Sequence, residues 1–578
     1  MLTQLRSSET MMTIVRACRP HLIYAGVFSA LLNILLIAPM LYMLQVYDRV
    51  IPTQGRVTLL LLSMALGFAL VTLTALEAIR SRLLVRASLR IDEALAAPVM
   101  RASLRLRQGS PRVLRQALRE LDTLRQAVTG ATLPAMLDLP WVPLYILIGF
   151  LLHFWIGVLT LVGVAAILAL AWYNEQATRG PLQQANVAAG RSYSLYDASL
   201  LSADVVQALG LGDALVRKHL DDRVAMLDLQ ADAGLSSSRL MAQSKLVRLA
   251  LQSAALGVGA LLAITAKISP GAVFASMFVV GRALSPIDQL VGSWRPMVQA
   301  RGALELLDGL SRMTPPTAQR VLLAAPTGRL SVEAVGVAPN PAAPILTGIN
   351  FTVEPGQVVG VVGPSGSGKS TLIRAIAGAE ALSDGTIRFD GADRHDWDHD
   401  QLTRYIGFMP QETLLFAGTI ADNISGFARV AGSDSSSTDE LVLKAAKLAG
   451  AHEMILNLRG GYNHQVEVGG RGLSAGQAQR VALARAVFRE PTYLLLDEPN
   501  ASLDADGDAQ LVATMERLKG AGTAIIVAAH RLTMLPLVDM LLVMREGRVA
   551  HFGPRDEVLA AIAPRPIPVR TVASGGRS

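Results

Sequence analysis

The sequence predicts an α-helical membrane domain fused to a soluble α/β domain. Three observations carry this prediction: long apolar runs in the first half, arginine-rich segments between them, and a glycine-rich loop that joins a β-like run to a helix-like run in the second half. The chain has 578 residues, of which 51% are hydrophobic, and a mean hydropathy of +0.39. A chain of this length holds several domains, because single cores stop growing beyond about 250–300 residues.

Six apolar runs are each close to the ~20 residues that a helix needs to cross a bilayer. They cover residues 22–47, 57–79, 133–152, 156–172, 249–266 and 272–291. The first run is too long to be a removable signal peptide. We therefore expect an N-terminal segment at 1–20 and a six-span domain at 21–312.

Positive residues predict the orientation of the spans. Arg6, Arg16 and Arg19 precede the first run, and the segment 80–128 between the second and third runs is rich in arginine. Because such residues collect on the cytoplasmic side, the N-terminus is expected in the cytoplasm. The net charge of +7 is then explained by membrane orientation, and no nucleic-acid partner is expected.

Two long segments between the spans, 80–128 and 173–248, repeat apolar residues at helical spacing. They are predicted to be cytoplasmic helical extensions of the spans that could carry movement from a soluble domain to the membrane. The alternative is that they are solvated helices that only link spans. Prolines at 315, 316 and 326 predict a linker at 313–329, followed by a soluble domain at 330–563 and a disordered tail at 564–578.

The glycine-rich loop lies between an apolar run at 358–362 and a helix-like run at 372–377. It consists of Gly363, Pro364, Ser365, Gly366, Ser367, Gly368, Lys369, Ser370 and Thr371. Its glycines let consecutive N–H groups and a helix N-terminus point at phosphates, while Lys369 reaches the terminal phosphates and Ser370 can ligate Mg²⁺. A turn without a ligand is the alternative, which both flanking runs disfavour. We predict that the chain binds a nucleoside triphosphate.

A second apolar run, 493–496, ends in two carboxylates, Asp497 and Glu498. If this strand lies beside the strand of the glycine-rich loop in a parallel sheet, Asp497 meets the Mg²⁺ shell and Glu498 polarises an attacking water. A strand that ends in Asp-Glu usually marks only the start of a loop. The phosphate loop upstream makes hydrolysis the expected function of this pair.

Residues Leu473-Ser474-Ala475-Gly476-Gln477 resemble the signature of ATP-binding cassette (ABC) proteins, normally Leu-Ser-Gly-Gly-Gln. The resemblance implies that Ser474, Ala475, Gly476 and Gln477 bind the γ-phosphate of ATP held by the opposite protomer. It also implies that Gln411 contacts Mg²⁺ and water, that Asp504 belongs to the D-loop at the nucleotide, and that His530 contacts the γ-phosphate. The expected catalytic residues are Glu498, His530 and Gln411, and the expected Mg²⁺ ligands are Ser370, Gln411 and Asp497.

The sequence departs from the family pattern at three places. Ala475 replaces a glycine, and its Cβ is expected to change affinity or turnover without abolishing them. The stretch 335–339 lacks the aromatic residue that often stacks on adenine, and Gly470 stands where an acidic residue usually precedes the signature. Stacking on the adenine base, and the coupling contact made by the usual acidic residue, are therefore in question.

One membrane domain followed by one nucleotide domain resembles half of a six-helix ABC exporter. One chain supplies one phosphate loop and one signature, so a homodimer is expected. The runs 42–50, 138–145 and 499–504 resemble those of type I secretion ATPase/permeases, especially the alkaline-protease exporter branch. For the first two runs, helix ends with interfacial Tyr and Trp anchors are a sufficient alternative.

This resemblance implies an ATP-driven transporter in a bacterial inner membrane, with its ATP-binding domain in the cytoplasm. The implied substrate is an unfolded polypeptide with an uncleaved C-terminal signal, passed to a periplasmic adaptor and an outer-membrane channel. The short segment before the first span predicts no peptidase domain there. Two alternatives stay open: a lipid or drug exporter, and a membrane-anchored regulatory ATPase.

Polar residues within the apolar runs are costly unless they face protein or water, and we single out four of them. They are Asn33, Asp138, Arg282 and Asp288. We expect them either to line the transport pathway or to form polar pairs between helices or protomers.

Overall fold

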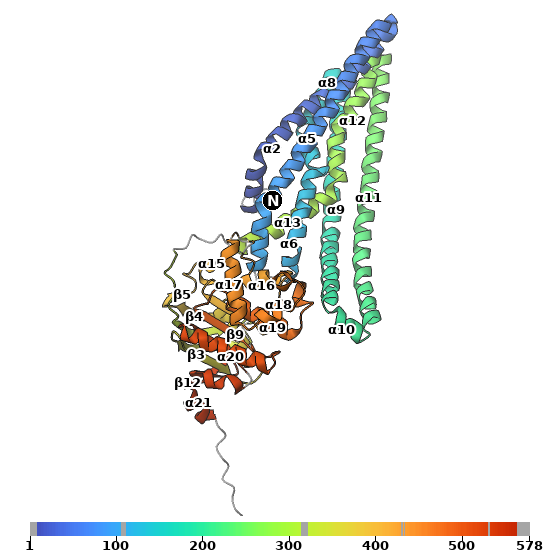
Figure 1. Cartoon of the computed structure of the whole chain (residues 1–578). Coiled ribbons are helices and arrows are strands. Elements are labelled where there is room, and N and C mark those ends of the chain that lie inside the picture. The colour runs from blue at the N-terminus through green and yellow to red at the C-terminus, as the bar shows by residue number, and fades with distance from the viewer. Residues whose placement is uncertain are drawn as a thin grey trace, which may run out of the picture. The chain divides into compact units, whose positions relative to one another are not determined.

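The computed structural model describes residues 9–105, 111–313, 322–340, 342–428, 430, 432, 434–529 and 532–562. The chain divides into two compact units, residues 1–316 and 317–578 (Figure 1). The predicted tail at 564–578 lies outside the described residues, as does much of the predicted linker. Each unit has hydrophobic clusters of its own.

The first unit consists of helices in its described part. They are α2 (Glu9–Leu35), α3 (Ala38–Gln45), the π-helix η1 (Val46–Val50), α4 (Ile51–Thr53), α5 (Arg56–Arg105), α6 (Pro111–Thr129), α7 (Thr132–Asp138), η2 (Leu139–Trp141), α8 (Val142–Leu152), α9 (Phe154–Leu201), α10 (Ala203–Ala208), α11 (Gly212–Ile264), α12 (Pro270–Gly292) and α13 (Trp294–Met313). Among them, six stretches are long and apolar enough to span a membrane: 10–53, 56–104, 132–152, 154–177, 212–264 and 270–292. Each overlaps one predicted run, so the six-span prediction is confirmed.

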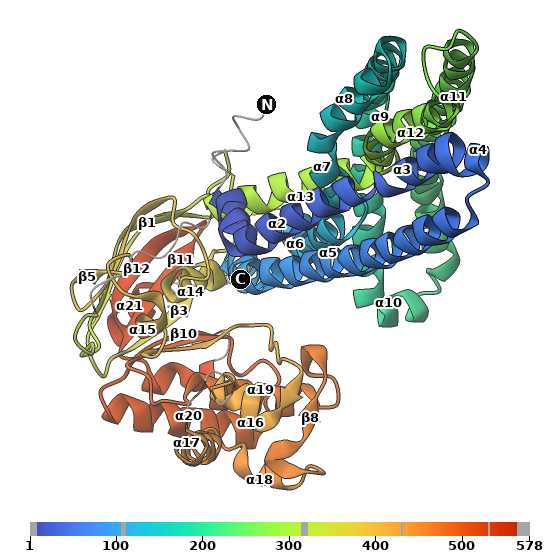
Figure 2. The same cartoon turned by 90° about the horizontal axis from the view of Figure 1, so that it is seen from above.

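Three of these helices run on far beyond the apolar runs predicted from the sequence. α5, α9 and α11 have 50, 48 and 53 residues, whereas a span needs ~20. α9 and α11 lie side by side and are joined at one end by the short α10 (Figures 1 and 2). The helices thus continue past the predicted runs, while the cytoplasmic placement of these extensions stays a prediction.

Apolar side chains on the outside distinguish this unit from a water-soluble bundle. No residue in the most apolar part of α5 is buried, and Val57 and Phe68 are 71% and 77% exposed. In α12, by contrast, 61% of the corresponding residues are buried. Water would penalise the surface of α5, whereas lipid accepts it because every backbone polar group is already bonded within the helix.

The second unit is an α/β domain with three sheets in its described part. Its strands are β1 (Leu330–Val337), β2 (Leu346–Val353), β3 (Val358–Val362), β4 (Asp384–Phe389), β5 (Ala392–Asp393), β6 (Ile406–Met409), β7 (Gly418–Thr419), β8 (Gln465–Val466), β9 (Tyr493–Asp497), β10 (Ala524–Ala528), β11 (Met540–Arg545) and β12 (Arg548–Pro554). The largest sheet has the order β12-β11-β3-β10-β9-β6, with β12 as the only antiparallel strand among these six. The other sheets are β2-β1-β4-β5 and β7-β8.

The helices of this unit are α14 (Lys369–Ala377), α15 (His399–Leu402), α16 (Ile420–Ser425), α17 (Ser435–Leu448), α18 (His452–Leu456), α19 (Ala475–Ala486), α20 (Ala505–Gly520) and α21 (Arg555–Ile562). Short helical turns η3 (Gly461–Asn463), η4 (Val468–Gly470) and η5 (Leu532–Leu537) complete it. Helices α16 to α19 gather in one part of the unit, away from β1 and β12 (Figure 2). The predicted fold class is confirmed.

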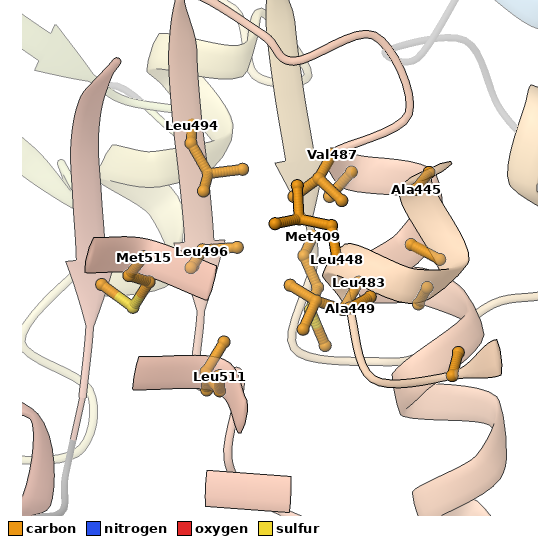
Figure 3. Close-up of a cluster of buried hydrophobic side chains, with 14 of the residues drawn as sticks. Met409, Ala445, Leu448, Ala449, Leu483, Val487, Leu494, Leu496, Leu511 and Met515 are labelled. Carbon is orange, nitrogen blue, oxygen red and sulfur yellow. The ribbon is translucent and has the colours of Figure 1, made fainter. Parts of the chain in front are cut away.

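The central sheet is apolar on both faces, which is what a covered parallel sheet requires. In β10, Ile525 and Val527 belong to one hydrophobic cluster and Ile526 and Ala528 to the other. This alternation follows from the two-residue period of a strand. In the first cluster, side chains of β9 pack with those of α17, α19 and α20 (Figure 3).

Candidate functional site

The glycine-rich loop connects the buried strand β3 to α14, as predicted. Gly368 has a φ of +97°, in the region that only glycine adopts readily. A Cβ added at Gly363 would lie 2.3 Å from the Met544 carbonyl oxygen. Glycine at these two positions therefore lets the loop turn tightly and present the N-terminus of α14, where N–H groups and the helix dipole favour phosphate.

Polar side chains converge inside this loop. Lys369 is 5% exposed, and its Nζ donates to the carbonyl oxygens of Gly363 at 2.9 Å and Pro364 at 3.0 Å. Ser367 is also buried, and its Oγ has no hydrogen-bond partner within the described residues. A buried hydroxyl without a partner is uncommon in folded proteins and fits a loop built to hold a ligand.

The two strands that carry the phosphate loop and the carboxylates are not neighbours, which corrects our expectation. β10 lies between β3 and β9 and pairs with both. Ser370 and Asp497 still meet, because all three parallel strands end at the same edge and α14 crosses that edge. Ser370 Oγ donates to Asp497 Oδ1 at 3.0 Å.

Asp497 lies at the buried end of β9 and is 2% exposed. Burial raises the pKa of its carboxyl group above the ordinary value, and the negative charge of Glu498 raises it further, against the bond from Ser370. The charged carboxylate is therefore costly here without a cation. Ser370 and Asp497 provide the hard oxygen donors that Mg²⁺ prefers, so the residues fit this ion.

Glu498 follows in an unusual backbone conformation. Its φ is +50°, the left-handed region that non-glycine residues rarely adopt. Its N–H donates to Ala528 O at 2.9 Å, and Gln411 Nε2 donates to its Oε2 at 3.1 Å. The structure thus brings together Gln411 and Glu498, two of the expected catalytic residues.

The signature residues form the start of α19. Ser474 is its N-cap and makes a reciprocal capping box with Gln477: Gln477 N donates to Ser474 Oγ at 3.3 Å, and Ser474 N donates to Gln477 Oε1 at 2.9 Å. Ala475 is exposed, so the protomer accommodates its Cβ. A Cβ on Gly476 would lie 3.0 Å from Ser502 O. Close packing therefore requires glycine at position 476 but not at position 475.

Asp504 caps the next helix, α20. Its Oδ1 accepts from Gly507 N at 2.9 Å and from Arg480 Nη2 at 2.7 Å. These bonds hold the pKa of the exposed Asp504 carboxyl below its ordinary value, and the bond from Gly507 has the largest effect. Asp504 is therefore joined to the signature helix, which the sequence did not predict.

Three positions singled out from the sequence remain to be placed: His530 and the two other departures from the family pattern. His530 lies outside the described residues. The stretch 335–339 ends strand β1 without an aromatic side chain, and Gly470 lies in the turn η4 before the signature. Sequence reasoning missed Gln479 and Arg480, whose only signal was a polar pair that follows the signature after one alanine.

The polar residues of the membrane unit form bonds between helices. Asp138 accepts from Arg80 Nη1 at 2.8 Å, from Asn33 Nδ2 at 2.9 Å and from Ser29 Oγ. Asp288 accepts from Ser244 Oγ at 2.6 Å and pairs with Arg248 Nε at 3.2 Å. Interhelical pairing, one of the two alternatives, is therefore observed for Asn33, Asp138 and Asp288, while a pathway role for Arg282 stays a prediction.

A phosphate loop, a pair of strand-end carboxylates and a capped signature helix define a P-loop nucleotide-binding domain, here joined to a six-span helical domain. Two family models match accordingly: the ABC transporter transmembrane region over residues 22–283 and the ABC transporter over 346–501. The type I secretion system ATP-binding protein PrsD of Rhizobium meliloti is 39% identical over 554 residues, 95% of this chain and 94% of the relative. The chain belongs to the ABC transporter family, in the branch of type I secretion ATP-binding proteins. As a member it binds ATP and hydrolyses it in transport.

Two further similarities agree. The alpha-hemolysin translocation ATP-binding protein HlyB of Escherichia coli is 29% identical and aligns over 92% of this chain and 76% of its own. The solved structure of a bacterial Atm1-family ABC exporter with ATP bound has a TM-score of 0.81 at 23% identity and covers 94% of this chain and 96% of that one. The structural similarity concerns the fold alone.

Proposed function

We propose that this protein is the inner-membrane ATPase and permease of a type I secretion system, which exports an unfolded polypeptide bearing an uncleaved C-terminal signal. The observation that carries the proposal is the 39% identity to a type I secretion protein along both units. Several other relatives are named as toxin translocation proteins, for an exotoxin in Pasteurella aerogenes and a leukotoxin in Mannheimia haemolytica.

The working form in this proposal is a homodimer. The chain carries one phosphate loop and one signature, and no hydrogen bond within the described residues joins Ser474–Gln477 to the loop Gly363–Thr371. Two protomers arranged head to tail would let each signature helix N-terminus complete the other's site. Closure of the two nucleotide domains would then depend on ATP.

In each site the residues have separate tasks. Lys369 and the loop N–H groups hold the phosphates, and Ser370, Asp497 and Gln411 would hold Mg²⁺, which neutralises phosphate charge when bound. Glu498 accepts the proton of the attacking water, and Gln411 orients the Glu498 carboxylate through the bond seen at 3.1 Å. Asp504 and His530 complete the nucleotide contacts.

Transport follows from the coupling of this site to the membrane. ATP must bind the closed dimer more tightly than the open one, since a ligand shifts an equilibrium only through unequal affinity. The long helices α5, α9 and α11 would carry the closing motion into the spans. The nucleotide domain lies in the cytoplasm in this proposal, and a periplasmic adaptor and an outer-membrane channel receive the polypeptide.

The test uses the full-length protein in lipid nanodiscs. ATPase activity is measured with a synthetic peptide of the last 50 or so residues of a secreted protein encoded beside the transporter and adaptor genes, with a scrambled peptide, and with lipids or amphiphiles. We expect stimulation by the native peptide alone. Stimulation by amphiphiles alone would support a lipid or drug exporter, and failure of every cargo to cross a membrane in proteoliposomes would support a regulatory ATPase.

A further inference from the structure

We propose that Gln479 is a positioning residue for ATP hydrolysis, which holds the backbone after Glu498 against the signature helix α19. This inference rests on the proposed role of Glu498 as the proton acceptor. The side chain of Gln479 bonds to backbone atoms of the loop, so its effect on hydrolysis passes through the loop.

The side chain of Gln479 clasps the loop at two points. It is 4% exposed, its Nε2 donates to Pro499 O at 2.5 Å, and its Oε1 accepts from Ser502 N at 2.9 Å. Both ends of the amide are therefore used, and a buried amide with both functions satisfied fixes its partners well. The two bonds begin one residue after Glu498 and end two residues before Asp504.

The helix that carries Gln479 is itself firmly anchored. On α19, Leu483 and the neighbouring Val487 pack with Met409, Leu494 and residues of α17 in the core (Figure 3). Ala478, Val481 and Ala482 are also buried. Gln479 thus projects from a rigid helix, so its hydrogen bonds fix the position of the loop relative to α19.

The loop needs such a restraint because Glu498 adopts a left-handed backbone. Such conformations persist at functional sites only where the surroundings over-determine them. The bond from Glu498 N to Ala528 O secures the N-terminal side of the residue, at 2.9 Å. On the C-terminal side, Ala501 N donates to Glu498 O at 3.2 Å, and the bonds of Gln479 to Pro499 and Ser502 hold this turn against α19. Loss of the Gln479 bonds therefore frees the turn from α19 and lets the Glu498 carboxylate move.

Further contacts bind the same two elements. A Cβ on Gly476 would lie 3.0 Å from Ser502 O, so the first turn of α19 lies directly on the loop. Arg480 Nη2 bonds Asp504 Oδ1 at 2.7 Å. The start of α19 and residues 499–504 therefore form one body, in which a displacement of the signature helix also displaces the backbone beside Glu498.

The test compares two glutamines of the same unit that clasp backbone in the same way. Gln401 Nε2 donates to Leu323 O at 2.6 Å and its Oε1 accepts from Leu323 N at 3.2 Å, and within the described residues no hydrogen bond joins it to a site residue. Gln479→Met and Gln401→Met each remove one donated and one accepted hydrogen bond to the backbone while keeping side-chain length. In the full-length protein in nanodiscs, we expect kcat to fall about tenfold for Gln479→Met with KM for ATP within about twofold, since phosphate binding is untouched.

The control variant should keep kcat while losing a similar amount of thermal stability. A wild-type kcat for Gln479→Met, or an equal loss of kcat for both variants, would overturn the inference. If Gln479→Met does not fold, Gln479→Glu replaces it: this variant keeps the shape and the acceptor for Ser502 N but loses the donor to Pro499 O, so unchanged kcat again refutes the role. Glu498→Gln, assayed in parallel, tests the base itself and separates failure of that assignment from failure of Gln479.

Discussion

Each unit contains a carboxylate at a junction of elements, half-buried in the membrane unit and buried in the nucleotide unit, and the two carboxylates have opposite surroundings. In the membrane unit, the side chain of Asp138 is 17% exposed and accepts from Arg80, Asn33 and Ser29. In the nucleotide unit, Asp497 is 2% exposed, and within the described residues its side chain accepts a hydrogen bond from the Ser370 hydroxyl alone. Asp138 has a direct ion pair with Arg80, whereas Asp497 has none within the described residues and feels Arg374 and Lys369 only at longer range.

This difference separates structure from function. A buried ion pair with additional hydrogen bonds is complete in itself and ties together the helices that supply its members. A buried carboxylate held by one neutral hydroxyl keeps unused acceptor capacity, and its raised pKa records the unfavourable energy of its charge. Such sites are retained where a ligand completes them.

The largest effect is expected at the carboxylate that does the chemistry. Glu498→Gln keeps the side-chain shape but removes the proton acceptor, so hydrolysis should fall by about 10²–10⁴-fold while ATP still binds and the closed dimer accumulates. Steady-state ATPase and nucleotide-binding assays measure this. Glu490 is a matched control, because it also has a positive φ, of +49°, but pairs with Lys444. Rapid turnover by Glu498→Gln would refute its assigned role.

A smaller effect, on stability, is expected when the paired carboxylate of the membrane unit is unbalanced. Arg80→Leu leaves the half-buried Asp138 without its cation and should lower the free energy of unfolding by about 1–3 kcal/mol. The double variant Arg80→Leu/Asp138→Leu should recover part of this loss in thermal denaturation. Arg90→Leu, in an exposed pair with Glu93, should cost less than ~1 kcal/mol. Equal losses for Arg80→Leu and Arg90→Leu would contradict the comparison.

The smallest effect is a gain in stability at the unbalanced carboxylate. Because the pKa of Asp497 is raised, the folded state holds the proton more tightly than the unfolded state, and stability is lost as pH rises from the ordinary Asp range through the folded pKa. Asp497→Asn should therefore raise the Tm of the nucleotide-free protein in EDTA by roughly 2–4 °C at pH 7.5. The gain should shrink toward pH 5. A Tm that falls at pH 7.5 would show that the charge is not costly.

The fold class and much of the nucleotide site could be predicted because their signals are local. Span length follows from bilayer thickness, and the loop at Gly363–Thr371 needs glycines where a Cβ would strike Met544 O. The capped start of α19 follows from Ser474 and Gln477, which are three residues apart. Each of these features depends on neighbours within one turn or one strand.

The features that could not be predicted depend on packing between segments that are distant in the sequence, which local patterns do not report. Arg80 and Asp138 are 58 positions apart, so no local pattern pairs them. β10 lies between β3 and β9 in the sheet, and the sequences of the individual strands do not encode this order. Gln479 looks like any polar residue of a helix until its loop partners are known.

The pairing of α9 with α11 limits how this chain can change its length. At 48 and 53 residues, these helices are about 70 and 80 Å long. One residue inserted within either would turn everything beyond it by about 100° and present the wrong side chains to the other helix. Insertions and deletions are therefore expected to concentrate at the corner 202–211, and an epitope tag placed there should be tolerated where the same tag in mid-helix is not.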